Sequence, residues 1–280
     1  MSSLKKEHKS PIRSIVEIVL MILVAFFFLF PIYWIIVTSL KPTFDIFTMP
    51  PKWIFKPTLA SYLRVFTLTP FGDHALNSII VSVAAVVLST IIGTMAAYGL
   101  TRFPIKGKKD LAFYMLSTRF APPIGFVIPY YLIFSGTNLI DTRIGLILVY
   151  IAFNLSFTVW MMKGIFESIP VEYEEAAMVD GMKRFQVLRS IVLRMSKSGI
   201  AATAIFAMIV TWNEFVFALN LTTLKAKTLP AVIPKFFAAT DIQWNVVSAA
   251  STMIIVPMII FSFFVQKYII RGLTMGAVRG

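Results

Sequence analysis

Six stretches of predominantly apolar residues, each about 20 positions long, alternate with shorter polar segments along the chain. They cover residues 15–37, 79–100, 111–134, 144–162, 199–221 and 246–265. A helix of about 20 residues crosses a hydrocarbon core of about 30 Å, whereas strands of a membrane barrel are about half as long and alternate in polarity. A helix also satisfies its backbone hydrogen bonds internally. The pattern predicts an all-α membrane protein with six transmembrane helices.

The composition supports a location in the lipid bilayer. Hydrophobic residues make up 58% of the chain and charged residues 14%, whereas soluble domains are usually about 45–50% apolar and about 25% charged. The chain has no cysteine, which excludes a disulfide framework and cysteine metal sites. Its two histidines, His8 and His74, have no second ligand near them in the sequence. We therefore expect no catalytic, metal or cofactor-binding residues in this chain.

The net charge of +13 indicates orientation rather than a nucleic-acid partner. With the amino terminus in the cytoplasm, 17 of the 26 Lys and Arg residues fall in cytoplasmic segments and 8 in external ones, while Arg119 lies inside a span. Cytoplasmic loops of membrane proteins carry an excess of Lys and Arg. We predict that both termini are cytoplasmic.

Outside the predicted spans the chain has no room for a catalytic or nucleotide-binding domain. The longest such segments, 38–78 and 163–198, are each about forty residues or fewer. The chain also lacks a GxxxxGK[ST] phosphate loop. If the protein uses ATP, another chain must bind it.

The cytoplasmic segment 163–198 contains a short helix with clear start and stop signals. Ser168 and Pro170 favour a helix start, acidic residues follow them, and Gly181 suits a left-handed cap at the end. A helix of about ten residues is marginal in water, so packing must hold it. The small apolar face of Ala176 and Ala177 fits either a shallow groove on a partner or the protein's own spans.

Polar residues within the spans are candidates for a solute pathway, because charges there are costly and usually face a cavity or a partner. They are Arg119, Asn154 and the group Trp212, Asn213 and Glu214. Arg119 precedes Pro122-Pro123, which predicts a kinked or broken third span. In the fifth span, an acid, an amide and an aromatic ring within one turn suit hydrogen bonding and stacking with a sugar or polyol. The alternative is a structural contact between helices.

The loop 163–198 resembles the EAA motif of membrane subunits of ATP-binding-cassette importers. Glu175-Ala176-Ala177, then Gly181 and Ile191-Val192-Leu193, have the spacing of that motif. The chain is also similar to the carbohydrate-importer branch, specifically the maltose-type second permease subunit, at Thr38-Ser39-Leu40-Lys41, Asn77-Ser78, 96–103, Trp212-Asn213-Glu214-Phe215 and the tail 271–280.

The resemblance implies a type I importer in a bacterial or archaeal cytoplasmic (inner) membrane. Its partners would be a second permease subunit, two ATPase subunits that carry ATP and Mg, an extracytoplasmic solute-binding protein and a carbohydrate. In that family the EAA loop seats in the ATPase. The coupling residues would then be Glu175, Ala176, Ala177, Asp180 and Gly181.

The resemblance also suggests a division of the chain. Residues 1–76 would hold the amino-terminal tail, the first helix and the first external loop. Residues 77–268 would form the importer transmembrane domain with five helices and the loop 163–198, and residues 269–280 would form a cytoplasmic tail that approaches the ATPase.

Three positions depart from the family pattern, which usually has proline where this chain has Ser156, Arg194 and Ser198. Without these prolines we expect a straighter exit from the loop. An ion-coupled secondary transporter is the alternative function, with Arg119 and Glu214 as relay groups. It predicts internal inverted repeats, and the sequence shows none.

Overall fold

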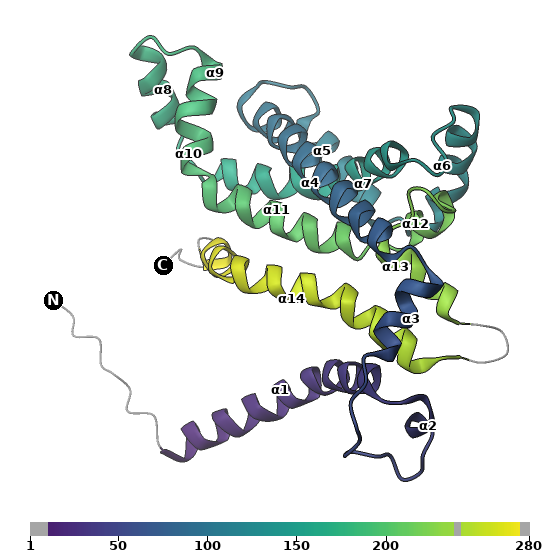
Figure 1. Cartoon of the computed structure of the whole chain (residues 1–280). Coiled ribbons are helices and arrows are strands. Elements are labelled where there is room, and N and C mark those ends of the chain that lie inside the picture. Colours follow the sequence, from purple (N-terminus) through teal and green to yellow (C-terminus); the bar gives the residue numbers. More distant parts are fainter. Residues whose placement is uncertain (1–10, 238–241, 275–280) are drawn as a thin grey trace. The chain divides into compact units, whose positions relative to one another are not determined.

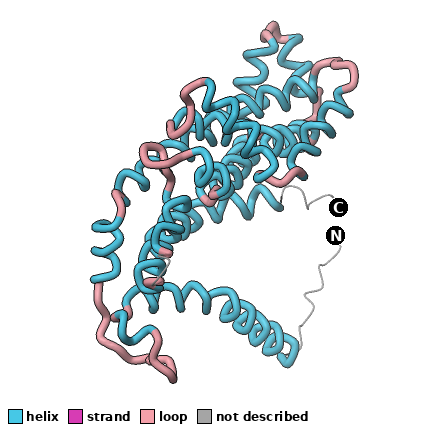
Figure 2. Tube along the Cα trace, turned by 90° about the vertical axis from the view of Figure 1, so that its right-hand side faces the viewer, coloured by secondary structure: helices cyan, strands magenta, loops and turns pink. Residues whose placement is uncertain are grey.

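The computed structural model describes residues 11–237 and 242–274. Throughout these ranges the backbone forms helices and loops, and the one pairing of extended residues is an isolated bridge between Phe237 and Ile242 (Figure 2). The helices are α1 (Pro11–Leu40), α2 (Thr43–Ile46), α3 (Ala60–Leu68), α4 (Phe71–Arg102), α5 (Lys108–Ser117), η1 (Thr118–Phe120), α6 (Ile124–Gly136), α7 (Arg143–Glu167), α8 (Glu172–Val179), α9 (Arg184–Val187), the π-helical η2 (Leu188–Val192), α10 (Leu193–Met195), α11 (Lys197–Trp212), α12 (Val216–Leu221), α13 (Leu229–Val232), η3 (Ile233–Phe236) and α14 (Trp244–Thr274).

Four helices are long and apolar enough to cross a membrane, and they correspond to the first, second, fourth and sixth predicted spans. They are α1, α4, α7 and α14. Two further pairs of helices meet the same criteria together but are bent, which brings the total to as many as six. The expected all-α architecture with six apolar segments is confirmed, and the helices extend beyond the predicted limits at several ends.

The third span is broken, as the Pro122-Pro123 pair predicts. The helices before and after residues 121–123 are bent by 98° relative to each other. Proline has no backbone N–H and its ring clashes with the preceding turn, so a continuous helix through two prolines is unfavourable. The break places Arg119 in η1, at the end of the first half of the span.

The fifth span departs from the prediction of one helix over 199–221. α11 ends at Trp212, and α12 begins at Val216 after a three-residue break. The Asn213 amide donates to Ile209 O at 2.8 Å, and the Glu214 carboxylate accepts from the N–H groups of Phe217 and Ala218 at 2.9 and 3.1 Å. Such local side-chain bonds to the backbone compete with a continuous helix.

The expectation of a straighter exit from the loop 163–198 is wrong. Segment Arg184–Met195 and α11 are bent by 76° at Ser196, although neither Arg194 nor Ser198 is a proline. Ser196 is buried, and Gly199 lies against Ile165 so closely that an added Cβ would meet Ile165 Cδ1 at 2.5 Å. The bend is thus followed, three residues later, by a close approach of α11 to α7 at a residue without a side chain.

The chain divides into two compact units. The first comprises Met1–Thr69 and Phe236–Met253, and the second Pro70–Lys235 and Ile254–Gly280. In the first unit, the end of α1 is tied to α3 by the Ser39 and Tyr62 hydroxyls at 2.7 Å, and Asn245 of α14 donates to Thr43 Oγ1 of α2 at 3.1 Å.

The second unit is built on three helices, α4, α7 and α11, that pack on one another. Its described residues include the following two hydrophobic cores. One joins the carboxyl ends of α4 and α7 to α8 and η2, and includes Tyr98, Phe166 and Ala177. The other joins α4 and α7 to α6 and α12, and includes Val81, Tyr150 and Phe217. Figure 1 shows α8 and α9 near the start of α11, and α12 and α13 near its far end.

The predicted tail contact with an ATPase falls mostly outside the described residues. α14 extends to Thr274, and residues 275–280 are not described.

Candidate functional site

The predicted short helix of the loop 163–198 is α8, and it ends at Gly181 as expected. Gly181 has φ +88°, a left-handed conformation that costs a residue with a Cβ more than it costs glycine. The Met182 N–H donates to Ala177 O at 3.0 Å and the Gly181 N–H to Met178 O at 3.1 Å. This pair of hydrogen bonds forms a Schellman cap. The cap turns the chain sharply away from the end of α8.

α8 has one buried face and one exposed face. Glu174 and Ala177 are buried, and Ala177 belongs to the core that joins α4, α7 and η2. The exposed face carries Tyr173, Glu175, Ala176 and Val179, of which Val179 is 88% exposed. Packing on the protein's own helices is therefore confirmed for Ala177, whereas contact of the exposed Ala176 with a groove on a partner stays a prediction.

A buried ion pair fixes α8 to the end of α4. Arg102 Nε donates to Glu174 Oε1 at 2.6 Å, and the Tyr98 hydroxyl donates to Glu174 Oε2 at 2.9 Å. The side chains of Arg102 and Glu174 are only 8% and 4% exposed. Arg102 Nη2 also donates to the carbonyl oxygens of Phe166 and Ile169, both at 3.0 Å. Because each charged group has several partners, the pair satisfies the condition under which a buried ion pair is tolerated.

None of the residues predicted from the sequence to have a role belongs to this cluster. Tyr98 and Arg102 lie in the segment 96–103, which carries part of the family resemblance, and Glu174 lies beside the proposed coupling residue Glu175. A tyrosine and an arginine four residues apart at the end of a predicted span are the signal that points to such a cluster, since positions i and i+4 share a helix face.

Asp180 closes α8 as its C-cap residue and is exposed. In the part of the chain that the structure describes, no hydrogen bond or ion pair of its carboxylate is present. The next helix, α9, has Lys183 as its N-cap residue, and the Lys183 N–H donates to the Gln186 side chain at 2.8 Å. Asp180 and Glu175 are both exposed.

Arg119 lines a cavity of about 240 Å³ between η1, α6, α7 and α12. Its guanidinium lies 4.7 Å from the ring centre of Phe153 and 5.4 Å from that of Phe157, and Nη1 donates to Phe153 O at 3.1 Å. The other lining residues are Thr118, Phe126, Tyr130, Val149, Ala152, Ser156 and Phe217. Aromatic faces attract cations by their quadrupole, so these rings stabilise the guanidinium, which has no acidic partner among the described residues.

Ser156 of α7 lines this cavity, at a position where the family resemblance leads one to expect proline. The hydroxyl of Ser156 and that of Thr118 lie 2.8 Å apart. The serine therefore replaces the expected kink of α7 with a hydrogen bond between α7 and η1.

Glu214 does not pair with Arg119 in the described residues. Its carboxylate accepts from the Tyr150 hydroxyl at 2.8 Å as well as from the N–H groups that begin α12. Both candidates nevertheless lie near Phe217. The Glu214 carboxylate accepts a hydrogen bond from the Phe217 N–H, and Arg119 and Phe217 both line the cavity. The structure thus brings the two charged candidates near one aromatic residue, Phe217.

The three neutral candidates are separated from that cavity. Asn154 is buried and donates to Thr211 Oγ1 at 2.7 Å, and in the described part of the chain its Oδ1 has no hydrogen-bond partner. Trp212 is buried and its Nε1 lies 3.3 Å from Ile254 O. Asn213 is exposed at the break after α11. None of the three lines the Arg119 cavity.

At the other end of α4, several side chains hold the segment 222–229. Asn77 Nδ2 donates to Lys225 O and Lys227 O at 2.9 and 3.0 Å, and Asn77 Oδ1 accepts from Arg143 Nε at 2.7 Å. Ser78 Oγ accepts from Leu229 N at 2.8 Å, and His74 Nδ1 lies 3.1 Å from Lys227 O. Asn77 is fully buried.

Asp141 holds the same segment from the other side. Its carboxylate accepts hydrogen bonds from the N–H groups of residues 223–226 and from the Thr223 hydroxyl, at 2.8–3.2 Å. Partial burial opposes the charge, but the bonds from the N–H groups of Lys225 and Ala226 and from Thr223 outweigh it and hold the pKa of Asp141 well below its usual value. Asp141 adopts φ +56°, which aspartate tolerates better than most residues.

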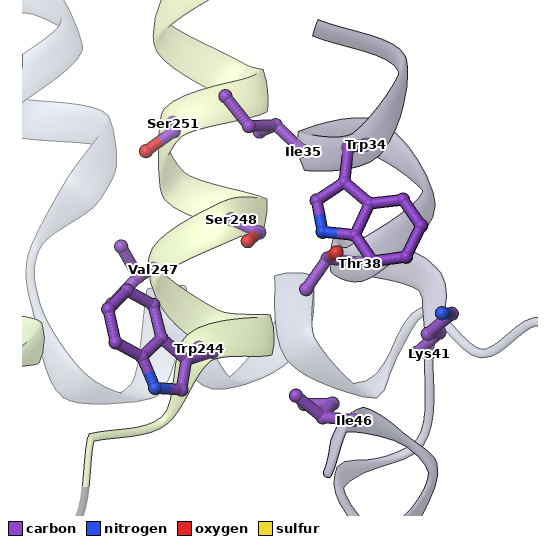
Figure 3. A pocket seen from close by; sticks show the side chains of 9 residues that line it. All are labelled: Trp34, Ile35, Thr38, Lys41, Ile46, Trp244, Val247, Ser248 and Ser251. Carbon is purple, nitrogen blue, oxygen red and sulfur yellow. The ribbon is translucent and has the colours of Figure 1, made fainter. Parts of the chain in front are cut away.

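The first unit contains a separate cavity of about 430 Å³. Figure 3 shows Trp34, Ile35 and Thr38 of α1 facing Trp244, Val247, Ser248 and Ser251 of α14, with Ile46 and Lys41 at the lower edge. The Lys41 ammonium lies 4.7 Å from the Trp34 ring centre and 5.5 Å from that of Phe55. Its lining is mainly apolar, and no residue proposed from the sequence lies in it.

The fold and the site define a polytopic helical membrane protein with a short capped helix exposed beside the ends of its long helices. The family described as "Binding-protein-dependent transport system inner membrane component" matches residues 10–275. The chain belongs to this family, so it is a permease subunit of a binding-protein-dependent importer rather than an ion-coupled transporter.

Individual relatives agree with this assignment over most of the chain. The trehalose/maltose transport system permease protein MalG of Thermococcus litoralis is 33% identical, with 96% of this chain and 98% of that protein covered. The diacetylchitobiose uptake system permease protein DasC of Streptomyces coelicolor is 32% identical, with 90% and 92% covered. The crystal structure of a bacterial ABC transporter involved in import of the acidic polysaccharide alginate has a chain with a TM-score of 0.76 and 27% identity, covering 92% of this chain and 96% of that one.

Proposed function

We propose that this chain is the permease subunit of an ATP-driven importer of carbohydrates, such as an oligosaccharide, sugar, polyol or sugar derivative. The names of relatives that match most of the chain support the substrate class, since they concern trehalose or maltose and diacetylchitobiose. The aromatic lining of the Arg119 cavity also suits sugar rings, because Tyr130, Phe153 and Phe217 offer apolar faces beside a hydrogen-bond donor.

The complete importer comprises this chain, a second permease subunit, two ATPase subunits and an extracytoplasmic solute-binding protein. ATP and Mg bind to the ATPase subunits, and this chain hydrolyses nothing itself. It lies in the cytoplasmic (inner) membrane of a bacterium or archaeon with both termini in the cytoplasm. The excess of Lys and Arg on the side that carries α8 supports this orientation.

The exposed face of α8 is the surface that engages the ATPase. Glu175, Ala176, Asp180 and Gly181 are exposed, and Ala177 anchors the helix from its buried side. The single observation that carries the coupling role is this division, because a helix of eight residues is held by its own protein on one face and presents small and acidic residues on the other. A shallow cleft can close around such a face without displacing the buried side.

The solute pathway passes the cavity beside Arg119 and the break that follows α11. Arg119 supplies hydrogen-bond donors, while Glu214 and Asn213 lie at the break between α11 and α12. Asn154 and Trp212 position the pathway helices through their bonds to Thr211 and Ile254. Half of the pathway belongs to this chain and half to the second permease subunit.

The decisive experiment is reconstitution of the four-subunit complex in lipid vesicles with its binding protein. We expect ATP hydrolysis to rise and labelled carbohydrate to enter when the binding protein carries its solute. Glu175→Lys should leave assembly intact and abolish uptake, whereas Glu172→Lys on the same exposed helix serves as the charge control. Normal uptake with Glu175→Lys would overturn the coupling role of α8, and stimulation only by a solute other than a carbohydrate would overturn the substrate class.

A further inference from the structure

We propose that α4 connects the two faces of this permease mechanically, with the Arg102–Glu174 pair as the joint at one end and Asn77 as the joint at the other. This inference rests on the proposed coupling function of α8. It assigns to named residues the route by which movement of α8 reaches the segment 222–229, and by which contact at that segment reaches α8.

The first joint holds three elements with one guanidinium. Arg102, the last residue of α4, donates hydrogen bonds to Glu174 of α8 and to two carbonyl groups at the end of α7. One belongs to Phe166 in the last turn of α7, and the other to Ile169 just after it. Tyr98, one turn earlier on α4, bonds to the second oxygen of the same carboxylate. A displacement of α8 that leaves Glu174 paired must therefore move the end of α4 and of α7 with it.

The second joint lies about 38 Å away along the helix axis, since 25 residues at about 1.5 Å each separate Asn77 from Arg102. The side-chain amide of Asn77 donates hydrogen bonds to the segment 222–229, and its carbonyl oxygen accepts one from Arg143, the first residue of α7. Ser78 and His74 add contacts with the backbone of the same segment. Each end of the α4–α7 pair thus contacts one of the two polar clusters.

α4, with α7 beside it, is an uninterrupted route between these ends. α4 contains 32 residues and α7 contains 25, and neither helix has an internal proline. In contrast, α1, α6 and α14 each have a proline inside the helix. The two other routes are interrupted, by the 98° bend between η1 and α6 and by the 76° bend before α11. Coupling between distant sites is carried by rigid elements and hydrogen-bond networks, and kinks are the places where a helix yields.

The test uses the absence of cysteine from this chain. Lys225→Cys introduces one cysteine in this subunit at an exposed side chain of the segment 222–229, where a spin label reports local movement. In the four-subunit complex with its binding protein, prepared with cysteine-free partners, we expect the label signal to change when ATP is added.

The double substitution Arg102→Met/Glu174→Met removes the pair without leaving one buried charge, which favours assembly. We expect it to reduce the ATP-dependent label signal about tenfold, within the usual range of coupling between sites, while basal ATP hydrolysis continues. The matched control is Lys163→Met/Glu167→Met, an exposed pair at the end of α7, which should leave the signal unchanged.

Asn77→Ala tests the same route from the other end and carries no buried charge. Because coupling free energy is reciprocal, it should reduce the stimulation of ATP hydrolysis by the solute-loaded binding protein as well as the label signal. A full label signal in either assembled variant would overturn the inference. If the wild-type complex itself shows no ATP-driven uptake, the proposed function fails; if it transports normally and the variants keep the signal, only the role of α4 fails.

Discussion

Gly93 of α4 lies directly against Thr158 of α7, so that a Cβ added at Gly93 would meet Thr158 Cγ2 at 2.6 Å and Thr158 Cβ at 2.8 Å. The closest helix approach in this pair therefore depends on the missing side chain. Small residues at such crossings let helix backbones pack closely in membranes. Thr158 is fully buried, so its side chain has little room to move away.

The first prediction concerns this contact. Gly93→Ala should lower the free energy of unfolding by about 1–3 kcal/mol, because an overpacked site shifts its neighbours. Thermal unfolding of the purified complex measures the change. Gly164→Ala is the control, since an added Cβ on that α7 glycine meets nothing within 4 Å. Equal thermal stability of the Gly93 and Gly164 variants would contradict the close packing of α4 on α7.

The second prediction separates two neighbouring glutamates. Glu174→Gln removes the carboxylate that Arg102 requires, so it should destabilise the complex by about 3–5 kcal/mol. Glu175→Gln changes an exposed side chain and should leave the unfolding temperature unchanged while lowering solute uptake. Unfolding and transport assays on the same preparations distinguish them. If Glu175→Gln is the more destabilising of the two, the assignment of faces to α8 is wrong.

The third prediction concerns the end of α8. Gly181→Ala places a Cβ at φ +88° and should cost about 1–2 kcal/mol of local stability. Gly181→Asn should cost less, because asparagine adopts this conformation more readily. Hydrogen exchange at the amides of Gly181 and Met182, or their variants, reports opening of the cap. Identical exchange in all three proteins would argue against the Schellman cap.

The fourth prediction is a dependence on pH at Asp141. Its folded-state pKa is depressed, so its contribution to stability is complete above the ordinary Asp pKa of about 4 and is lost as the pH falls through the lower folded-state value. Asp141→Asn should increase hydrogen exchange of residues 223–226 at pH 7 and should flatten the loss of stability below about pH 4. A variant that keeps the wild-type acid response would show that other groups cause it.

The fifth prediction distinguishes capping from charge at Glu214. Glu214→Ala removes the acceptor for two N–H groups of α12 and should cost about 1 kcal/mol, as for other lost caps. Glu214→Gln keeps a carbonyl acceptor. If capping is the main role, Gln should restore both stability and uptake. If the negative charge contacts the solute, Gln should restore stability alone, and uptake measured against solute concentration shows which applies.

The apolar pattern predicted the long helices well, because the requirement for about 20 apolar helical residues leaves few alternatives in lipid. The break at Pro122-Pro123 was also predictable, since proline acts locally. The break at Asn213 was not, because Asn and Glu end a helix only when their side chains find particular backbone partners. The bend at Ser196 was not predictable either, because no proline marks it, and the contact of Gly199 with Ile165 beside it joins residues 34 positions apart.

The site was predictable in composition but not in geometry. Glu174 and Glu175 are identical in type and adjacent, and the sequence identified the loop that holds them. Which of the two glutamates is buried depends on where the fold places Arg102, which lies 72 residues earlier along the chain. In the same way, Asn77 was visible only as a shared dipeptide until its bonds to residues 225 and 227 were known.

The guanidinium of Arg119 has a consequence for electrical insulation. An importer that opens a path for a neutral solute must not let sodium ions or protons leak down the membrane potential. Arg119 places a fixed positive charge among aromatic rings, with its guanidinium 4.7 Å from the centre of Phe153. A positive charge in a narrow path repels cations electrostatically, as in water-selective pores. If the solute passes this cavity, the same residue that offers hydrogen bonds to a sugar also keeps the membrane sealed to cations.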